Sequence, residues 1–234
     1  MVNAQHALAL FLFVGVPLWD LLETRALKTS PNPCRKIFSY QRILAVEWIA
    51  ALSAWLLLRT EVFHTAPSAR HSALHKIDSS FIWGLILALL VGSLLQAFLV
   101  GRNLKVRDKL LKAFRTLDFI LPVTREERAW FALVSITAGI CEEILYRGFL
   151  IRYLSESPWH AGIRYAMAVS SLAFGMAHGY QGLKGIAGTA IIGAVMAVVF
   201  IITGSLWLPI ALHAAFDLRV LLLFRSSGSA VLRS

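Results

Sequence analysis

The sequence predicts an all-α integral membrane protein, a bundle of about seven transmembrane helices that encloses a polar cavity. The 234 residues are 58% hydrophobic and only 15% charged, which leaves too little polar surface to cover a soluble domain. The apolar residues form long runs without the alternating polarity of a transmembrane β-strand, so helices are expected. Several runs also contain charged side chains, which lipid tolerates poorly unless they share a cavity.

Seven apolar segments define the expected spans, although several are shorter than the roughly 20 residues of a full crossing. They are residues 7–22, 43–58, 81–100, 129–146, 164–178, 186–203 and 206–224. An eighth segment is compatible with the same pattern. The first segment is expected to be retained as a helix, because residues 1–6 carry no Lys or Arg and no small-residue cleavage site follows it.

The basic residues lie between the apolar segments rather than on one soluble domain, which argues against nucleic acid as the partner of this +10 chain. With seven spans, 16 Lys and Arg residues fall on one side of the membrane and five on the other. The positive-inside rule then places the N-terminus outside and the C-terminus inside. The basic stretch 102–128 has two open interpretations: it binds anionic lipid headgroups, or it only anchors the topology.

Two local patterns predict how helices begin and pack. Thr124 followed by Glu127 has the spacing of a capping box at the start of the fourth span. Gly175 and Gly179 form a small-xxx-small pair, which would allow a neighbouring helix to approach closely.

The fourth segment contains Glu142, Glu143 and Arg147, although each charged residue costs about 2.5–3.5 kcal/mol inside a membrane helix. Glu143 and Arg147 are i,i+4 neighbours and are expected to pair. Glu142 points about 100° away from Glu143, so it is not expected to take part in this pair and can serve another function.

Further ionisable residues lie at the end of the fifth segment, His178, and on one face of the seventh, His213 and Asp217. A lone buried His is usually a hydrogen-bonded core residue, and a Glu–Arg pair can simply join two helices. Six such residues acting independently would each carry the full cost of burial, so we expect them to meet at one cavity. Glu47 in the second segment either lines that cavity or makes a solitary interhelical hydrogen bond.

Together these residues resemble the three motifs of the CAAX-protease and bacteriocin-processing (CPBP) family of intramembrane endopeptidases. The motifs are Glu142-Glu143-x-x-x-Arg147, Phe174-x-x-x-His178 and His213-x-x-x-Asp217. The flanking residues 138–140 and 203–209 resemble the prokaryotic branch. On this resemblance, residues 124–224 form a peptidase core, preceded by transmembrane helices with basic loops (1–123) and followed by a tail (225–234).

The resemblance implies a hydrolase of a prokaryotic plasma membrane that cleaves a peptide bond in a membrane-associated or lipid-modified protein or peptide. It also implies roles: Glu142 activates water, His178 assists it, His213 and Asp217 stabilise the oxyanion, and Glu143 and Arg147 support the site. The family often has Asn at the position of Asp217. Either Asp217 keeps a proton and donates it, or it accepts a hydrogen bond from His213 and orients that ring.

Other classes of site and function are less well supported by the sequence. No His-Glu-x-x-His motif is present, and Ser170 and Ser171 lack the motif of a rhomboid-like serine site. Zinc bound by Glu142, His178 and His213 is chemically feasible, but the resemblance favours a glutamate mechanism without a cofactor. A non-proteolytic membrane immunity or scaffold protein of the same family is the alternative function. The two cysteines are expected to form neither a metal site nor a disulfide.

Overall fold

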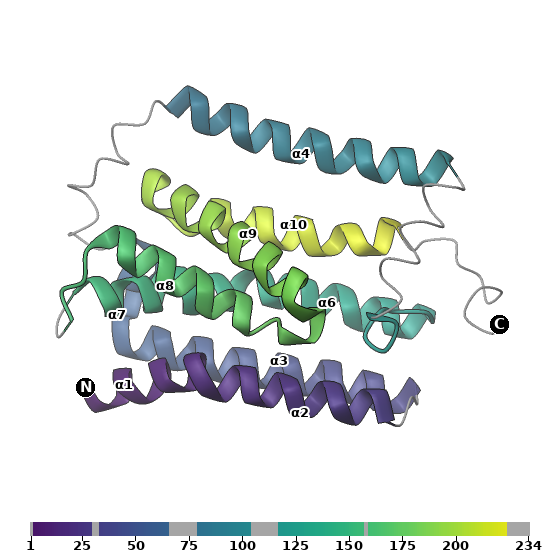
Figure 1. Cartoon of the computed structure of the whole chain (residues 1–234), viewed down its shortest axis with the longest axis horizontal. Helices are drawn as coiled ribbons and strands as arrows, with labels where there is room; N and C mark the ends of the chain where they lie inside the picture. The colour runs from purple at the N-terminus through teal and green to yellow at the C-terminus, as the bar shows by residue number, and fades with distance from the viewer. Residues whose placement is uncertain (1, 30–32, 66–78, 104–116, 157–158, 224–234) are drawn as a thin grey trace.

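The structure is a computed structural model that describes residues 2–29, 33–65, 79–103, 117–156 and 159–223. Within these ranges the chain is a bundle of helices that run side by side (Figure 1). The helices are α1 (Val2–Leu10), η1 (Phe11–Gly15), α2 (Val16–Thr29), α3 (Pro33–Leu58), η2 (Arg59–Phe63), α4 (Ser79–Arg102), α6 (Arg125–Glu142), η6 (Glu143–Leu150), α7 (Ile151–Ser155), α8 (Ile163–Met176), η7 (Gly179–Gln181), α9 (Gly182–Thr203) and α10 (Trp207–Leu223). The predicted all-α membrane fold is confirmed.

Each of the seven predicted segments coincides with one helix or with a continuous run of consecutive helices. By length and composition, four helical stretches among the described residues can cross a membrane: Val2–Thr29, Cys34–Phe63, Arg125–Ser155 and Gly179–Thr203. The first residues of α1 and the last residues of α10 lie at opposite ends of the bundle (Figure 1). The count of seven spans and the side that each loop faces stay predictions, and residues 104–116 of the basic stretch lie outside the described residues.

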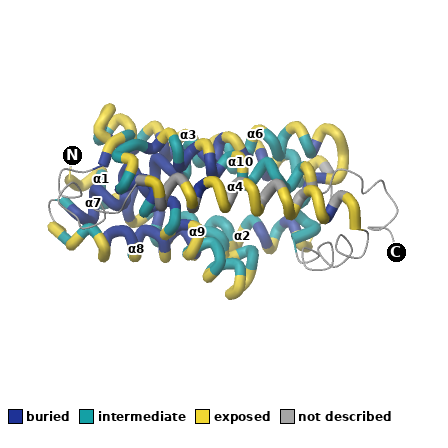
Figure 2. The backbone as a smooth tube through the Cα atoms, turned by 90° about the horizontal axis from the view of Figure 1, so that it is seen from above, coloured by how far each residue is buried: buried dark blue, intermediate teal, exposed yellow. Residues whose placement is uncertain are grey.

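The rod formed by α6, η6 and α7 lies inside the bundle. It packs against α3 and α10, while α8 packs on α9 and also contacts η6 and α7. Residues 143–155 are all buried, and Figure 2 shows buried backbone around α7 and α8 and many exposed residues along α4. The ionisable motif at the start of η6 therefore begins a continuous buried stretch, residues 143–155.

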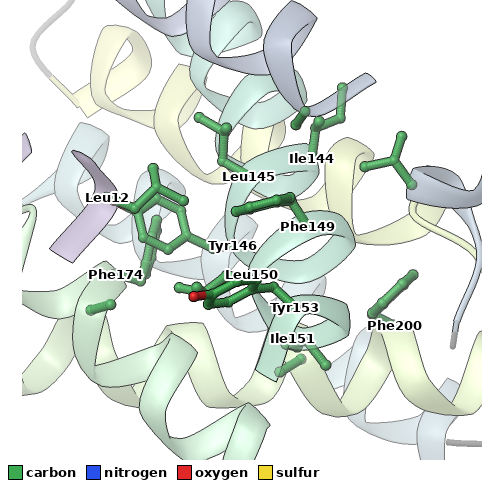
Figure 3. Close-up of a cluster of buried hydrophobic side chains, with 14 of the residues drawn as sticks. Leu12, Ile144, Leu145, Tyr146, Phe149, Leu150, Ile151, Tyr153, Phe174 and Phe200 are labelled. Atoms are coloured by element: carbon green, nitrogen blue, oxygen red, sulfur yellow. The ribbon is translucent and has the colours of Figure 1, made fainter. Parts of the chain in front are cut away.

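Large hydrophobic side chains fix η6 in place. Leu12 from η1, Phe174 from α8 and Phe200 from α9 converge on it, and Figure 3 shows them around Phe149 and Leu150. Leu12, Phe149 and Leu150 are completely shielded from solvent. Such dense packing resists displacement, so the residues at the start of η6 have fixed positions.

Both local predictions can be compared with the structure. The capping box is confirmed: Thr124 Oγ1 accepts from the Glu127 amide at 3.1 Å, and Glu127 Oε2 accepts from the Thr124 amide at 3.2 Å. Gly175 lies against α9, where an added Cβ would sit 2.7 Å from the Ile186 carbonyl oxygen. The expectation for Gly179 was wrong, because this residue lies beyond the end of α8 in the short turn η7.

Candidate active site

Glu143 and Arg147 form a buried ion pair at the start of η6. Arg147 Nη1 lies 2.9 Å from Glu143 Oε1, and the two side chains are 1% and 0% exposed. The predicted pairing is confirmed, although this turn is a π-helix and not the α-helix that the spacing assumed. Arg147 Nη2 also donates to the Gly193 carbonyl at 3.2 Å, and the guanidinium lies 4.3 Å from the centroid of the Phe174 ring. These contacts hold Arg147 between η6, α8 and α9.

The same Glu143 oxygen orients His213 of α10, at 2.8 Å from Nδ1. Because a carboxylate paired with arginine accepts hydrogen bonds, we assign the shared proton to Nδ1. The other ring nitrogen, Nε2, lies 3.6 Å from Glu142 Oε2 and 3.7 Å from Asp217 Oδ2. His213 is therefore oriented by Glu143, and the suggestion that Asp217 orients it by a hydrogen bond is wrong in this structure.

His178 follows directly on the end of α8, and its Nδ1 lies 2.9 Å from the Phe174 carbonyl oxygen. A carbonyl can only accept, so this contact assigns the proton to Nδ1 and leaves Nε2 as an acceptor. The Phe174 ring meets both histidine rings edge-on, with centroid distances of 4.8 Å to His178 and 5.7 Å to His213. Phe174, known from the sequence only as a motif position, thus contacts three of the six predicted residues.

A cavity of about 280 Å³ lies beside this network, between α2, α3, α6, α10 and the turn η7. Glu142, His178 and Asp217 line it. Glu143, Arg147 and His213 lie behind this lining and are connected to it through the contacts described above. The structure therefore places all six predicted residues in one network, and three of them reach the cavity. Glu47 of α3 also lines the cavity, so the first of the two interpretations given for this residue is confirmed.

Asp20 of α2 is a site residue that the sequence reasoning did not identify. Its Oδ2 accepts a hydrogen bond from the Tyr180 amide at 3.0 Å and lies in the cavity lining. The Tyr180 ring lies 5.8 Å from the ring of His178, so Asp20 fastens the turn that follows this histidine. The cost of a carboxylate within the first apolar segment was the signal that could have identified it.

Two further expectations concern metals and cysteines. Among the described residues no group of three or more His, Cys, Asp and Glu side chains is arranged to hold a metal ion. Cys34 is exposed and Cys141 is buried, and no disulfide joins the two.

Residues 124–219 match the sequence model of a family described as type II CAAX prenyl endopeptidase Rce1-like. No curated protein and no solved structure matches the chain. The matched region runs from the capping box to α10 and contains all six predicted site residues. Residues 124–219 of this membrane protein are therefore similar to the Rce1-like, CAAX-type protease family, in agreement with the resemblance of the motifs to the CPBP family.

Proposed function

We propose that the protein is an intramembrane endopeptidase in which Glu142 activates the water that hydrolyses a peptide bond. The observation that supports this most strongly is the division of labour between adjacent glutamates. Glu143 is fully buried, forms an ion pair with Arg147 and is hydrogen-bonded to His213 through the same oxygen. Glu142 lines the cavity with 17% of its side chain exposed, and its nearest charged contact is the His213 ring at 3.6 Å.

The proposed reaction uses the side chains around the cavity. Glu142 takes a proton from water while the water oxygen attacks the carbonyl carbon of the scissile bond. His178 accepts a hydrogen bond from the same water through Nε2, because its Nδ1 is bonded to Phe174. When the tetrahedral intermediate collapses, the C–N bond breaks and the proton on Glu142 passes to the leaving amine.

His213 is the proposed donor to the oxyanion of that intermediate. Since Nδ1 already donates to Glu143, donation through Nε2 requires the imidazolium form of the ring. Carboxylate oxygens of Glu142, Glu143 and Asp217 lie 2.8–3.7 Å from its nitrogens and balance that charge. In this arrangement Asp217 acts through its charge and needs no proton of its own.

The substrate that we propose is a membrane-associated or lipid-modified protein or peptide in a prokaryotic plasma membrane. Farnesylated quenched-fluorescence peptides ending in a CAAX-type sequence are the first probe, used with the full chain reconstituted in liposomes. Wild type should cleave them, and Glu142→Gln should lower the rate by at least about 100-fold. Glu126→Gln is the matched control, because Glu126 is an exposed glutamate of the same helix outside the cavity.

A second experiment distinguishes a peptidase from a non-proteolytic immunity or scaffold protein. If a stably expressed Glu142→Ala variant keeps the full biological output of the chain, the cavity serves binding and the peptidase proposal fails. We also propose a metal-free reaction, so cleavage should persist with strong chelators. Activity lost to chelation and restored by zinc would instead favour a metal enzyme.

The proposed topology has the N-terminus outside and the C-terminus inside. Reporter domains fused within the loops at Arg70 and Lys112 should therefore appear on opposite sides of the membrane. Their appearance on the same side would contradict seven spans.

A further inference from the structure

The cavity is acidic although the chain as a whole is basic. Four carboxylates line it, and no Lys or Arg does so among the described residues, whereas the chain carries a formal charge of +10. The four are Asp20, Glu47, Glu142 and Asp217. This lining provides an electrostatic environment that favours a positively charged group.

Glu47 is the one of these four for which neither the fold nor the proposed reaction supplies a use. Asp20 holds the Tyr180 amide, Glu142 acts on water, and Asp217 lies beside His213. Glu47 Oε2 is buried and has no hydrogen-bond partner among the described residues. A buried carboxylate without a partner is costly, so its presence in an apolar span points to a ligand.

The chemistry around Glu47 suits a cation rather than another acceptor. Glu47 comes from α3, which packs on α6, and interacts electrostatically with Glu142 and Asp217. Three carboxylates that line one partly open cavity repel one another, and a positive charge close to them relieves this repulsion. The charge proposed on His213 lies against Glu142, Glu143 and Asp217, whereas Glu47 Oε2 has no hydrogen-bond partner among the described residues, so a cationic group that enters the cavity would supply the partner that Glu47 lacks.

We propose that Glu47 selects substrates with a Lys or Arg side chain close to the scissile bond, an inference that rests on the endopeptidase proposed above. The ammonium or guanidinium group would form a charge-assisted hydrogen bond with Glu47. The apolar part of the lining, with Leu12, Ile43 and Leu145, would hold the methylene stem. A volume of about 280 Å³ is close to the lower end of ligand pockets, about 300 Å³, and accommodates one such side chain beside the peptide bond.

The test compares farnesylated quenched peptides in which each position around the scissile bond carries Lys or its uncharged counterpart norleucine. Wild-type kcat/KM should be about tenfold or more higher for Lys than for norleucine at one position. Glu47→Gln should reduce that ratio to about one and leave cleavage of the norleucine peptide within about twofold. Glu47→Lys should favour a Glu peptide over the Lys peptide, and Glu126→Gln should leave the ratio unchanged.

Binding to the inactive Glu142→Gln protein provides a readout that does not depend on cleavage. Fluorescence anisotropy with the same labelled Lys and norleucine peptides should show tighter binding of Lys, and the Glu47→Gln/Glu142→Gln protein should lose that difference. No preference for Lys at any position, or a preference that survives Glu47→Gln, would overturn the proposal. Equal loss of cleavage for both peptides in folded Glu47→Gln would also overturn it, because Glu47 would then act in the reaction itself. Absence of all cleavage by wild type would refute the endopeptidase, while the binding comparison would still decide the role of Glu47.

Discussion

Replacing Glu143 by glutamine should destabilise the protein strongly, whereas the same replacement at the adjacent Glu142 should not. Glu143 is completely buried and its Oε1 bonds to Arg147 at 2.9 Å and to His213 at 2.8 Å. Its amide counterpart carries no charge, so the guanidinium of Arg147 would stay buried without a counterion. Glu142 lies 3.6 Å from His213 Nε2, a longer contact than either of these, and its side chain faces the cavity.

The size of the effect follows from the burial of the pair. Removing one partner of a buried ion pair costs about 3–5 kcal/mol, because the remaining charge is left uncompensated. Glu143→Gln should lower the free energy of unfolding by this amount, partly offset by the Arg147 contacts to Gly193 and Phe174. Glu142→Gln should change it by less than about 1 kcal/mol, because the contact of Glu142 with His213 is longer, at 3.6 Å, and 17% of its side chain is exposed.

The seven tryptophans of the chain provide the signal for an unfolding titration with SDS in mixed micelles. Wild type, Glu142→Gln, Glu143→Gln and the exposed control Glu126→Gln would be compared in the same micelles, together with their peptidase rates. Both site variants should be inactive, but only Glu143→Gln should be destabilised. A double variant, Glu143→Met with Arg147→Met, should be more stable than either single one because it removes both buried charges.

If Glu142→Gln and Glu143→Gln destabilised the protein equally, the assignment of a structural role to Glu143 and of a catalytic role to Glu142 would be refuted. A Glu143→Gln protein as stable as wild type would show that neither the Arg147 ion pair nor the His213 contact of Glu143 stabilises the fold. An active Glu142→Gln protein with an intact fold would contradict the proposed base directly.

Substitutions at three further positions test separate parts of the structure. Asp217→Asn should keep kcat within about tenfold of wild type, because the carboxylates of Glu142 and Glu143 still balance the charge proposed on His213, and complete inactivation would show that the charge of Asp217 is indispensable. Gly148→Ala should destabilise by about 1–3 kcal/mol in the SDS titration, since its Cβ would lie 2.2 Å from the Val62 carbonyl oxygen, and a neutral result would mean that this contact relaxes freely. Thr124→Ala should cost about 1 kcal/mol and Thr124→Ser little, because serine keeps the cap on the Glu127 amide; equal effects of the two would argue against the capping box.

The sequence predicted those features that depend on neighbours along one helix. The helical segments follow from runs of apolar residues, the pairing of Glu143 with Arg147 from i,i+4 spacing, and the cap at Thr124 from a four-residue pattern. The convergence of six ionisable residues on one site followed from the free-energy cost of placing each of them alone in lipid. These arguments need no knowledge of how one helix is rotated against another.

The contacts between helices could not be predicted in the same way. A membrane helix that is apolar on all sides gives no sign of which face meets its neighbour. One of the two roles expected for Asp217 was therefore to accept a hydrogen bond from His213, four residues away on the same helix, although the hydrogen-bond partner of His213 is Glu143 from another helix. The π-helical turn η6 was also missed, because no short pattern of residue types marks such a turn, although such turns are frequent at functional sites.

The cavity depends on helices outside the region that matches the family. Residues 124–219 supply Glu142, His178 and Asp217, but α2 and α3 close the opposite wall with Asp20 and Glu47. Asp20 fixes the turn after His178 through the Tyr180 amide, so the N-terminal helix helps to position a proposed catalytic group. On the proposals above, two chains that share the matched region but differ in these first helices would keep the same reaction and receive differently charged substrates. We therefore propose that the chemistry belongs to α6, η6, α10 and the turn after α8, and that selection belongs to α3.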